Sequence, residues 1–433
     1  MTTHLLPPGP LPMSRDASPD EVFAAVEAEL PPGPHDLLIY LHVPFCPSKC
    51  HFCDFVADLD TADLRSGPPI RARYVAALQS QIRAYAPKLA AMGYQPKRIY
   101  WGGGTPSQLN ADELVDICRT LNLSFDMSSL EEHSFEANPD SLTLEKVSRL
   151  VAEGVNRVSI GVQSFNDEEL ARAGRAHSAQ DAVDAARAIR GGGITNFNID
   201  LIAGLTGQSD DDLKYSLDTC ISLEPMHVTV YNYRPDKRTV MGRQIKRGDR
   251  PTQYVTSMLR AFDIVRSRLT AAGYEEYALG YFAREGKRFL GESYYFELTG
   301  DYIGFGSGSV SILGHHIASN THKTFHRFRD DPLTFESYGR YAPQRFELLT
   351  RELRLALLMW NGIDYARFER LFGFPFATMR ELPAMRRYLE YFENCGAEFV
   401  EDSTGLRVTD ETKLTAHLRT YEASHLYTAG ARQ

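Results

Sequence analysis

Three cysteines lie within eight residues near the start of the chain, and their spacing is the strongest chemical signal in the sequence. Three residues separate Cys46 from Cys50, and two separate Cys50 from Cys53. Pro44 and Pro47 disfavour a helix at this point, so a loop can wrap the three thiolates around one inorganic cluster. The pattern therefore predicts that these cysteines hold a metal cluster at a catalytic centre.

A four-iron cubane held by three thiolates has one iron without a protein ligand. Such an iron is poorly suited to simple electron storage, but it can bind a substrate. The amino and carboxylate groups of S-adenosylmethionine (SAM) can chelate it, and one electron then cleaves the S–C5′ bond to release a 5′-deoxyadenosyl radical. We therefore expect a [4Fe–4S] cluster and SAM as cofactors, with Cys46, Cys50 and Cys53 as the metal ligands.

Zinc is the main alternative for this group of thiols. Structural zinc normally takes four ligands in a closed tetrahedron, and the nearest candidate for a fourth, His51, lies between two of the cysteines and would strain the loop. The aromatic Phe52 before the last cysteine also favours the iron–sulfur interpretation. The other cysteines, Cys118, Cys220 and Cys395, stand singly on or beside predicted helices, where we expect buried apolar side chains.

The composition is that of a soluble globular protein. The 433 residues are 43% hydrophobic and 24% charged, enough for one large α/β domain and a smaller appendage. A formal net charge of -9 without a long basic run argues against nucleic-acid binding. The sequence shows neither a signal-peptide pattern nor 18 consecutive apolar residues, so we expect a cytoplasmic protein without a membrane partner.

Strand and helix signals alternate from Leu37 onward. The predicted strands are Leu37–Val43, Arg98–Trp101, Ser134–Ala137, Arg157–Val162, Asn196–Ile202 and His227–Tyr233. The predicted helices are Arg71–Ala91, Ala111–Leu121, Leu144–Glu153, Ala179–Arg190 and Asp210–Leu223. Six units in series imply a parallel sheet, short of the eight that close a barrel. We therefore expect an α/β fold built on a partial (β/α)6 TIM-type barrel, open at one side to a large substrate.

The chain is expected to divide into four regions. Residues 1–36 form an N-terminal extension that packs loosely and carries a helix near Ser18–Leu30, begun by a capping box of Ser18 and Glu21. Residues 37–245 form the partial barrel, and residues 246–342 an α/β extension that caps it. Residues 343–433 form a small, mainly helical domain of winged-helix type, with a strand pair at Glu398–Val400 and Leu406–Thr409.

The cysteine loop resembles the signature of the radical SAM superfamily. The stretch Tyr40-Leu-His-Val-Pro-Phe-Cys46 is similar to that of its oxygen-independent coproporphyrinogen III oxidase-like subfamily, and the likeness extends over about residues 37–340. The resemblance implies a SAM site at the mouth of the barrel, where the cysteine loop follows the first strand. The implied SAM-binding residues are Tyr40, Phe52, Gly103, Gly104, Thr105, Glu136, Gln163, Arg175 and Asp200.

The resemblance also implies a role for several of these residues. The glycines let the backbone approach the methionyl amino group, and Glu136 suits the ribose hydroxyls. The fork of Arg175 matches the SAM carboxylate, and Asp200 lies near the adenosine. Each residue also has a simpler interpretation, as a turn glycine, a surface carboxylate or an ion-paired arginine. Their shared position after successive strands favours the SAM site.

The subfamily includes coproporphyrinogen oxidases, heme chaperones and class C methyltransferases or cyclopropanases. The resembled oxidases carry a further cysteine where this chain has Phe55, and the chaperones carry a His-Asn…Tyr-Trp stretch where it reads Leu290-Gly-Glu-Ser-Tyr-Tyr-Phe296. These departures favour the methyltransferase branch. There the adenosyl radical abstracts hydrogen from the methyl group of a second SAM, and the methylene radical adds to an sp2 carbon. Heme trafficking and coproporphyrinogen decarboxylation remain alternatives.

The second SAM is expected against Tyr233, Arg234 and the glycine-rich segment with Gly304 and Gly306. An aromatic wall for a flat substrate, or ordinary core packing, would explain a further set of residues: Tyr231, Tyr233, Tyr281, Tyr294, Tyr295 and Phe296. Three histidines could be proton shuttles or heme ligands, or simply hydrogen-bonded: His315, His316 and His322. Expected partners are a small aromatic natural-product intermediate and an electron donor of flavodoxin or ferredoxin type. A partner methyltransferase is left open.

Overall fold

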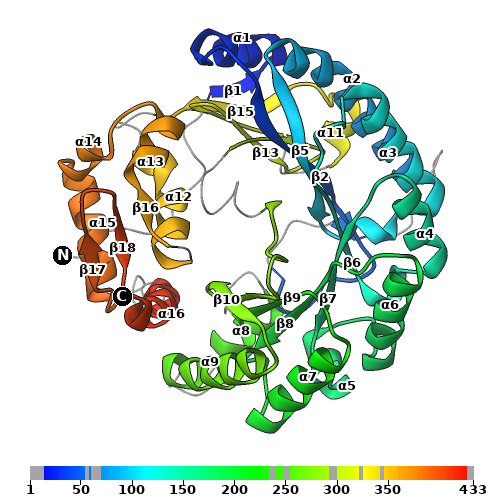
Figure 1. Cartoon of the computed structure of the whole chain (residues 1–433), viewed down its shortest axis with the longest axis vertical. Helices are drawn as coiled ribbons and strands as arrows, with labels where there is room; N and C mark the ends of the chain where they lie inside the picture. Colours follow the sequence, from blue (N-terminus) through cyan, green and yellow to red (C-terminus); the bar gives the residue numbers. More distant parts are fainter. Residues whose placement is uncertain are drawn as a thin grey trace.

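The computed structural model describes residues 14–53, 58–59, 70–233, 239–246, 254–291, 300–320, 325–341, 346–359 and 361–426. Most strands of these residues join one curved sheet, which is wrapped on its outside by helices (Figure 1). The C-terminal helices occupy the side on which the sheet does not close (Figure 1). Within the described ranges, none of the helices combines the length and the apolar character that a membrane span requires.

Seven neighbouring strands in the described part of the sheet run parallel. In spatial order they are β12 (Asp301–Phe305), β2 (His35–Val43), β5 (Tyr94–Gly103), β6 (Glu132–Ala137), β7 (Arg157–Gln163), β8 (Phe197–Ala203) and β9 (His227–Asn232). All six predicted strands are present, and the α/β fold with a parallel partial barrel is confirmed. The seventh, β12, comes from the glycine-rich segment that the sequence analysis assigned to the capping region, so six units understate the parallel sheet.

Antiparallel strands extend both edges. On the β12 side the order continues through β13 (Val310–Leu313), β14 (His316–Ser319), β15 (Phe335–Arg340) and β1 (Ser14–Ala17). On the β9 side it continues through β11 (Tyr281–Ala283) and β10 (Glu275–Ala278). A separate two-stranded pair, β3 (Phe45–Cys46) with β4 (Asp58–Leu59), begins the cysteine loop. The parallel core is thus widened at both edges rather than closed on itself.

Helices of the barrel cover the outer face of the sheet. They are α2 (Ile70–Ala91), α3 (Ala111–Ser124), α4 (Leu144–Ala152), α5 (Asp167–Ala173), α6 (Ala179–Gly191), α7 (Asp210–Ser222), α8 (Val240–Lys246), α9 (Tyr254–Ala271) and α11 (Phe325–Asp330), with short 3-10 turns at Pro106–Gln108 and Pro139–Ser141. Capping boxes begin α3, α6 and α7 because Asn110, Ser178 and Ser209 each exchange hydrogen bonds with an acid three residues on. These caps explain why the predicted helix starts were accurate.

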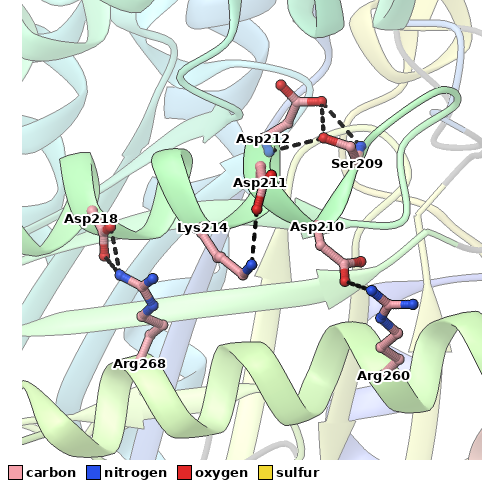
Figure 2. Close-up of polar contacts among 8 residues, drawn as sticks. All are labelled: Ser209, Asp210, Asp211, Asp212, Lys214, Asp218, Arg260 and Arg268. Carbon is pink, nitrogen blue, oxygen red and sulfur yellow. Dashed lines mark hydrogen bonds and ion pairs between the residues drawn. The ribbon is translucent and has the colours of Figure 1, made fainter.

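Two ion pairs join α7 to α9. Asp210 pairs with Arg260, and two helical turns later Asp218 pairs with Arg268 (Figure 2). The same spacing on both helices sets them parallel, side by side. The pairs are surface-exposed, so they fix register more than they add stability.

The N-terminal residues are an integral part of the fold, contrary to the loose packing expected from the sequence. Strand β1 pairs with β15, and α1 (Pro19–Glu29) follows it. Ser18 caps this helix as predicted, since its hydroxyl accepts from the Glu21 amide. Val22, Phe23 and Val26 are buried in the main core because the apolar face of α1 lies against the barrel.

The C-terminal elements form a small helical unit with a three-stranded sheet. They are α12 (Phe346–Leu358), β16 (Ile363–Asp364), α13 (Tyr365–Phe372), α14 (Phe376–Arg380), α15 (Pro383–Asn394), β17 (Phe399–Glu401), β18 (Gly405–Val408) and α16 (Asp410–Leu426). The sheet order is β16-β18-β17, which includes the predicted strand pair. The apolar cluster of this unit also contains Leu38 of β2 and Tyr302 of β12, so the unit packs against strands of the barrel.

Candidate functional site

The cysteine loop leaves the carboxyl end of β2, at the mouth of the barrel. Cys46 ends the short strand β3, while Cys50 and Cys53 lie in the turn that follows; all three residues are half-buried, and none of the three forms a disulfide. The Cys53 amide donates to the carbonyl of Cys50 (3.2 Å), which tightens the turn. The three thiols of this loop therefore lie at the mouth of the barrel, as the sequence predicted.

His51 anchors the loop to the neighbouring helices. Its amide donates to the carbonyl of Ala173 (2.8 Å), its carbonyl accepts from the Met241 amide (2.9 Å), and its ring Nδ1 is hydrogen-bonded to the carbonyl of Arg172 (2.9 Å). The imidazole therefore contacts the end of α5, which weakens the case for a fourth zinc ligand. Among the described residues, no three His, Cys, Asp or Glu side chains converge closely enough to hold a single metal ion.

Two of the thiols are contacted from outside the loop. The sulfur of Cys46 lies 3.6 Å from the Thr105 hydroxyl, and Arg175 Nη1 donates to the sulfur of Cys50 (3.3 Å). Burial raises the pKa of the Cys46 thiol, and the Thr105 contact opposes that shift. Three thiols in one loop, with a guanidinium beside one of them, suit an anionic iron–sulfur cluster.

Glycines at the end of β5 let that strand pack against the cysteine loop. The Gly104 amide donates to the carbonyl of Val43 (2.7 Å), and a Cβ at Gly104 would lie 2.7 Å from the carbonyl oxygen of Phe45. Gly103 has φ +114°, and its Cβ would lie 2.9 Å from the His42 ring. Contact with the loop thus suffices to explain both glycines, and their contact with SAM stays a prediction.

Arg175 links the cysteine loop to two strand ends. Besides its bond to Cys50, Nη2 donates to the side-chain oxygen of Asn138 (2.9 Å) and to the carbonyl of Gly161 (2.5 Å). Its Nε is buried and has no hydrogen-bond partner in the described part of the chain. This nitrogen is a spare donor at the place where a SAM carboxylate is expected.

Gln163 ends β7 in a conformation that is rare for a residue with a side chain. Its φ is +73°, and the ladder between β7 and β8 shifts register between Gly161 and Gln163. Left-handed backbone at a residue other than glycine costs of the order of 1 kcal/mol and is typical of binding sites. The strain supports the predicted role of Gln163 at the mouth.

Glu136 lies inside the barrel among tyrosines. The Tyr100 hydroxyl donates to Glu136 Oε1, and the ring of Tyr40 stacks on that of Tyr100 with centroids 6.1 Å apart. A Cβ at Gly102 would lie 3.2 Å from Oε2, so a side chain at this position would crowd the second oxygen. Burial raises the pKa of Glu136 to about 7, although the bond from Tyr100 opposes that shift.

Asp200 occupies the same interior, one strand beyond β7. It accepts from the Asn198 amide (2.7 Å) and from the Ser159 hydroxyl (3.1 Å). Burial raises the pKa of Asp200, and these two donors counteract it. Asn198 also hydrogen-bonds His227, whose other ring nitrogen lies 2.7 Å from the Tyr277 hydroxyl. The carboxylate therefore belongs to a connected polar network.

The residues expected around a second SAM do not converge in the described structure. Tyr233 is 2% exposed and packs with Met241 and Phe52 below the cysteine loop. Gly304 and Gly306 lie at the end of β12, where their amides donate to Ser311 Oγ (3.0 Å) and Gln81 Oε1 (2.9 Å). Arg234 lies outside the described residues. The second-SAM assignment stays a prediction.

Part of the expected aromatic wall is present. Tyr231 is 43% exposed and meets Tyr281 edge to face, with centroids 6.1 Å apart. Tyr233 is buried among apolar side chains that include Ile202 and Met241, so core packing, the alternative to the wall, explains it. Tyr294, Tyr295 and Phe296 lie outside the described residues.

The histidines near the glycine-rich segment have local partners. His315 Nδ1 lies 3.3 Å from Glu29 of α1, and His316 Nδ1 is hydrogen-bonded to the Tyr338 hydroxyl (2.8 Å). The hydrogen-bonded alternative is therefore correct for these two. His322 lies outside the described residues.

Sequence reasoning missed several polar residues of the barrel interior, above all Tyr100, Arg157 and Asn198. Strands buried on both faces usually read as nearly continuous apolar runs. Here polar residues alternate with apolar ones, as in Arg157-Val-Ser-Ile-Gly161. That alternation is the signal that could have identified a polar interior.

Comparison with known proteins agrees with this geometry. The family model described as the Radical SAM superfamily matches residues 40–220. The chain is 31% identical to the heme chaperone HemW of Bacillus subtilis over 77% of this chain and 86% of that protein, and 33% identical to the HemW of Escherichia coli over 77% and 88%. It is 28% identical to the oxygen-independent coproporphyrinogen III oxidase of Escherichia coli over 83% and 79%.

The solved structure of coproporphyrinogen III oxidase (HemN) from Escherichia coli matches with a TM-score of 0.74 and 24% identity over 94% of both chains, which shows the shared fold. The names of these relatives correspond to the alternatives of heme trafficking and coproporphyrinogen oxidation, and they give no support to methyl transfer. Family membership implies a [4Fe–4S] cluster and SAM. The chain belongs to the oxygen-independent coproporphyrinogen III oxidase-like (HemN/HemW) subfamily of the radical SAM superfamily.

Proposed function

We propose that this chain binds a [4Fe–4S] cluster through Cys46, Cys50 and Cys53 and cleaves SAM reductively, with heme as the molecule that it handles. The observation that carries the first part is the loop of three half-buried cysteines, outside any disulfide, at the barrel mouth. The heme part rests on relatives named heme chaperone, two of which are 31% and 33% identical over most of their length.

A cluster held by Cys46, Cys50 and Cys53 would supply the single electron that reductive cleavage of SAM requires. The chain's own residues hold and orient the ligand. Thr105 and Arg175 contact two of the thiols, and Arg175 keeps one buried N–H for a carboxylate. Glu136 offers Oε2 to ribose hydroxyls because Tyr100 occupies only Oε1. The barrel mouth thus presents acceptors for hydroxyls and donors for a carboxylate.

Methyl or methylene transfer from a second SAM to an sp2 carbon of an aromatic intermediate is a second candidate. Phe55 replaces the further cysteine of the resembled oxidases, and Leu290–Phe296 departs from the stretch of the heme chaperones. The exposed Tyr231 beside Tyr281 gives the barrel an aromatic surface that suits a flat substrate. A flavodoxin- or ferredoxin-type electron donor is proposed for either candidate.

Cluster binding is tested by anaerobic reconstitution of the wild type and of Cys50→Ala. The wild type is expected to hold about four irons per chain and to release 5′-deoxyadenosine from SAM under reduction. Cys50→Ala is expected to lose both, while Cys395→Ala, a buried thiol far along the chain, retains them. Full iron loading and undiminished SAM cleavage in Cys50→Ala would contradict the proposal.

The two candidates are separated by adding heme, and methyl-deuterated SAM, to the cluster-loaded wild type. A stable Soret band at one heme per chain, without S-adenosylhomocysteine, supports heme handling. Deuterium in 5′-deoxyadenosine together with S-adenosylhomocysteine supports transfer from a second SAM. Absence of heme binding removes the first candidate.

A further inference from the structure

The barrel interior contains a buried positive charge that no role described above requires. Arg157 begins β7 on the inward-facing side, in register with Ser134 of β6. The next inward residue, Ser159, is in register with Glu136 and with Asn198. Since two residues of a strand span about 6–7 Å, Arg157 lies one layer beneath the carboxylate of Glu136.

Arg157 is poorly compensated for a buried guanidinium. The residue is 2% exposed, its Nη1 reaches Ser134 Oγ at only 3.5 Å, and its Nε has no hydrogen-bond partner in the described part of the chain. The ring of Phe289 covers one face, 4.2 Å from the guanidinium carbon. Buried charges are normally ion-paired or fully hydrogen-bonded. An arginine that has no such partner among the described residues points to a function of its charge.

The groups above Arg157 respond to that charge. Burial raises the pKa of both Glu136 and Asp200, and the positive charge of Arg157 acts against burial at each. Burial holds the pKa of His227 well below its ordinary value, with Arg157 adding to the effect, so this imidazole is neutral. Without Arg157, burial and mutual repulsion of the two acids would favour their protonated forms.

The other titratable groups described around Glu136 have identified contacts or are neutral. Glu132, on the same strand, accepts from the Ser134 hydroxyl and the Leu290 amide. Tyr40 and Tyr100 are neutral neighbours, because burial raises the pKa of both phenols. Three further groups face this region: Arg98, paired with Glu131; Arg175, bound to Asn138 and Gly161; and Tyr231, exposed on β9.

We propose that Arg157 is a positioning residue of the SAM site, which favours the ionised forms of Glu136 and Asp200 so that both can accept hydrogen bonds from ligand hydroxyls. This inference rests on the proposed binding of SAM. An ionised carboxylate accepts at both oxygens, whereas a protonated one must donate at one of them. With Glu136 Oε1 accepting from Tyr100, protonation of Oε2 removes the acceptor that the hydroxyls of SAM would use.

The test measures SAM affinity of the cluster-loaded protein by anaerobic equilibrium dialysis between pH 6 and 8.5. In the wild type, affinity is expected to rise through a midpoint near the pKa of Glu136, about 7. In Arg157→Met the midpoint is expected to move up by about one pH unit. Affinity at pH 7 then falls roughly fivefold, while affinity at pH 8.5 stays within about twofold of the wild type. Arg157→Lys, which keeps the positive charge, is expected to bring the pH midpoint most of the way back to the wild-type value.

A matched control keeps the charge and removes the stacking. Phe289→Leu loses the ring over Arg157, and its midpoint is expected to equal that of the wild type. If Arg157→Met does not fold, Arg157→Gln, which retains a donor toward Ser134, replaces it.

Three outcomes would overturn the inference. They are an unchanged midpoint in Arg157→Met, a loss of affinity that is equal at every pH, and a wild-type affinity that is independent of pH. Failure of the wild type to bind SAM at any pH would instead overturn the proposed function, so the two failures are distinguishable.

Discussion

The cysteine loop has no room for a side chain at Gly104. A Cβ there would lie 2.7 Å from the carbonyl oxygen of Phe45 and 2.8 Å from the carbonyl carbon of Pro44, both backbone atoms just before Cys46. Backbone cannot rotate away as a flexible side chain can, so Gly104→Ala must displace the loop. We expect the iron content after reconstitution to fall to less than about half, since cluster assembly needs all three thiols in place.

Gly191→Ala is the matched control, because its Cβ would meet only the flexible Leu144 side chain, at 3.3 Å. Iron and sulfide analysis of both variants, with circular dichroism to verify folding, provides the measurement. Wild-type iron loading in Gly104→Ala would show that the loop tolerates the methyl group.

Glu136 makes stability depend on pH in a predictable direction. The unfolded chain loses this proton near the ordinary pKa of 4.5, whereas the folded chain keeps it until about pH 7 because burial raises the pKa. Between these values the folded state binds more protons, so stability falls as pH rises, by up to roughly 1.4 kcal/mol per pH unit. Glu136→Gln keeps an acceptor for Tyr100 and lacks the titration.

Urea unfolding of both proteins at pH 5.5 and pH 7.5 measures this effect. The variant is expected to gain stability relative to the wild type as pH rises. A stability difference that is the same at both pH values would mean that Glu136 titrates normally in the folded chain.

At the scale of the elements, two salt bridges with the same spacing on both helices join α7 to α9 at the surface (Figure 2). The side chains of Asp218 and Arg268 are 53% and 40% exposed, so solvent screens their attraction. A double-mutant cycle with Asp218→Asn and Arg268→Gln is expected to give a coupling free energy of about 0.5 kcal/mol at low salt. It should approach zero at 1 M NaCl because the Debye length then shrinks to about 3 Å.

The pair Asp211–Lys214, which lies within α7, provides the comparison, since its removal leaves the helix–helix contact intact. A coupling above about 2 kcal/mol for Asp218–Arg268 would indicate a desolvated pair, which its exposure contradicts.

Some secondary-structure elements could be predicted from the sequence and others could not. Strands β5 to β9 alternate with capped helices, and local hydrophobic periodicity and capping residues mark both. The sequence did not predict strand β12, because Gly304 and Gly306 weaken the strand signal. Its pairing with β2 also joins residues that are far apart in the sequence. The short strand β1 was not predicted either, because it forms only by pairing with β15, which is far away in the sequence.

In the candidate site, the cysteine loop from Cys46 to Cys53 could be predicted, because its signal is a spacing of residues that are close together in the sequence. Residues that follow strand ends, such as Arg175, could be inferred from resemblance. The alternation of polar and apolar residues could have placed Tyr100 and Arg157 in a polar interior, but their importance depends on which strands become neighbours and on how deeply Arg157 is buried. The structure alone supplies both facts.

At the scale of the whole molecule, the N-terminal extension joins segments that are far apart in the chain. Phe23 of α1 is 4% exposed and packs on Tyr85 of α2 (centroids 5.0 Å apart) and on Phe335 of β15 (6.3 Å). Removing a buried phenylalanine costs about 3–5 kcal/mol, through lost burial and the cavity left behind. Phe23→Ala is therefore expected to lower the free energy of unfolding by about 3 kcal/mol or more.

Anaerobic urea unfolding of the cluster-loaded protein measures this loss. Leu123→Ala is the control, because Leu123 is 89% exposed and its truncation should change stability by no more than about 0.5 kcal/mol. Because Phe23 touches a helix and a strand 250 residues apart, its loss should lower the midpoint of a single transition rather than melt α1 alone. If Phe23→Ala lowered the free energy of unfolding no more than Leu123→Ala does, α1 would be only loosely attached. The antiparallel strands at this edge of the sheet would then be stable without it.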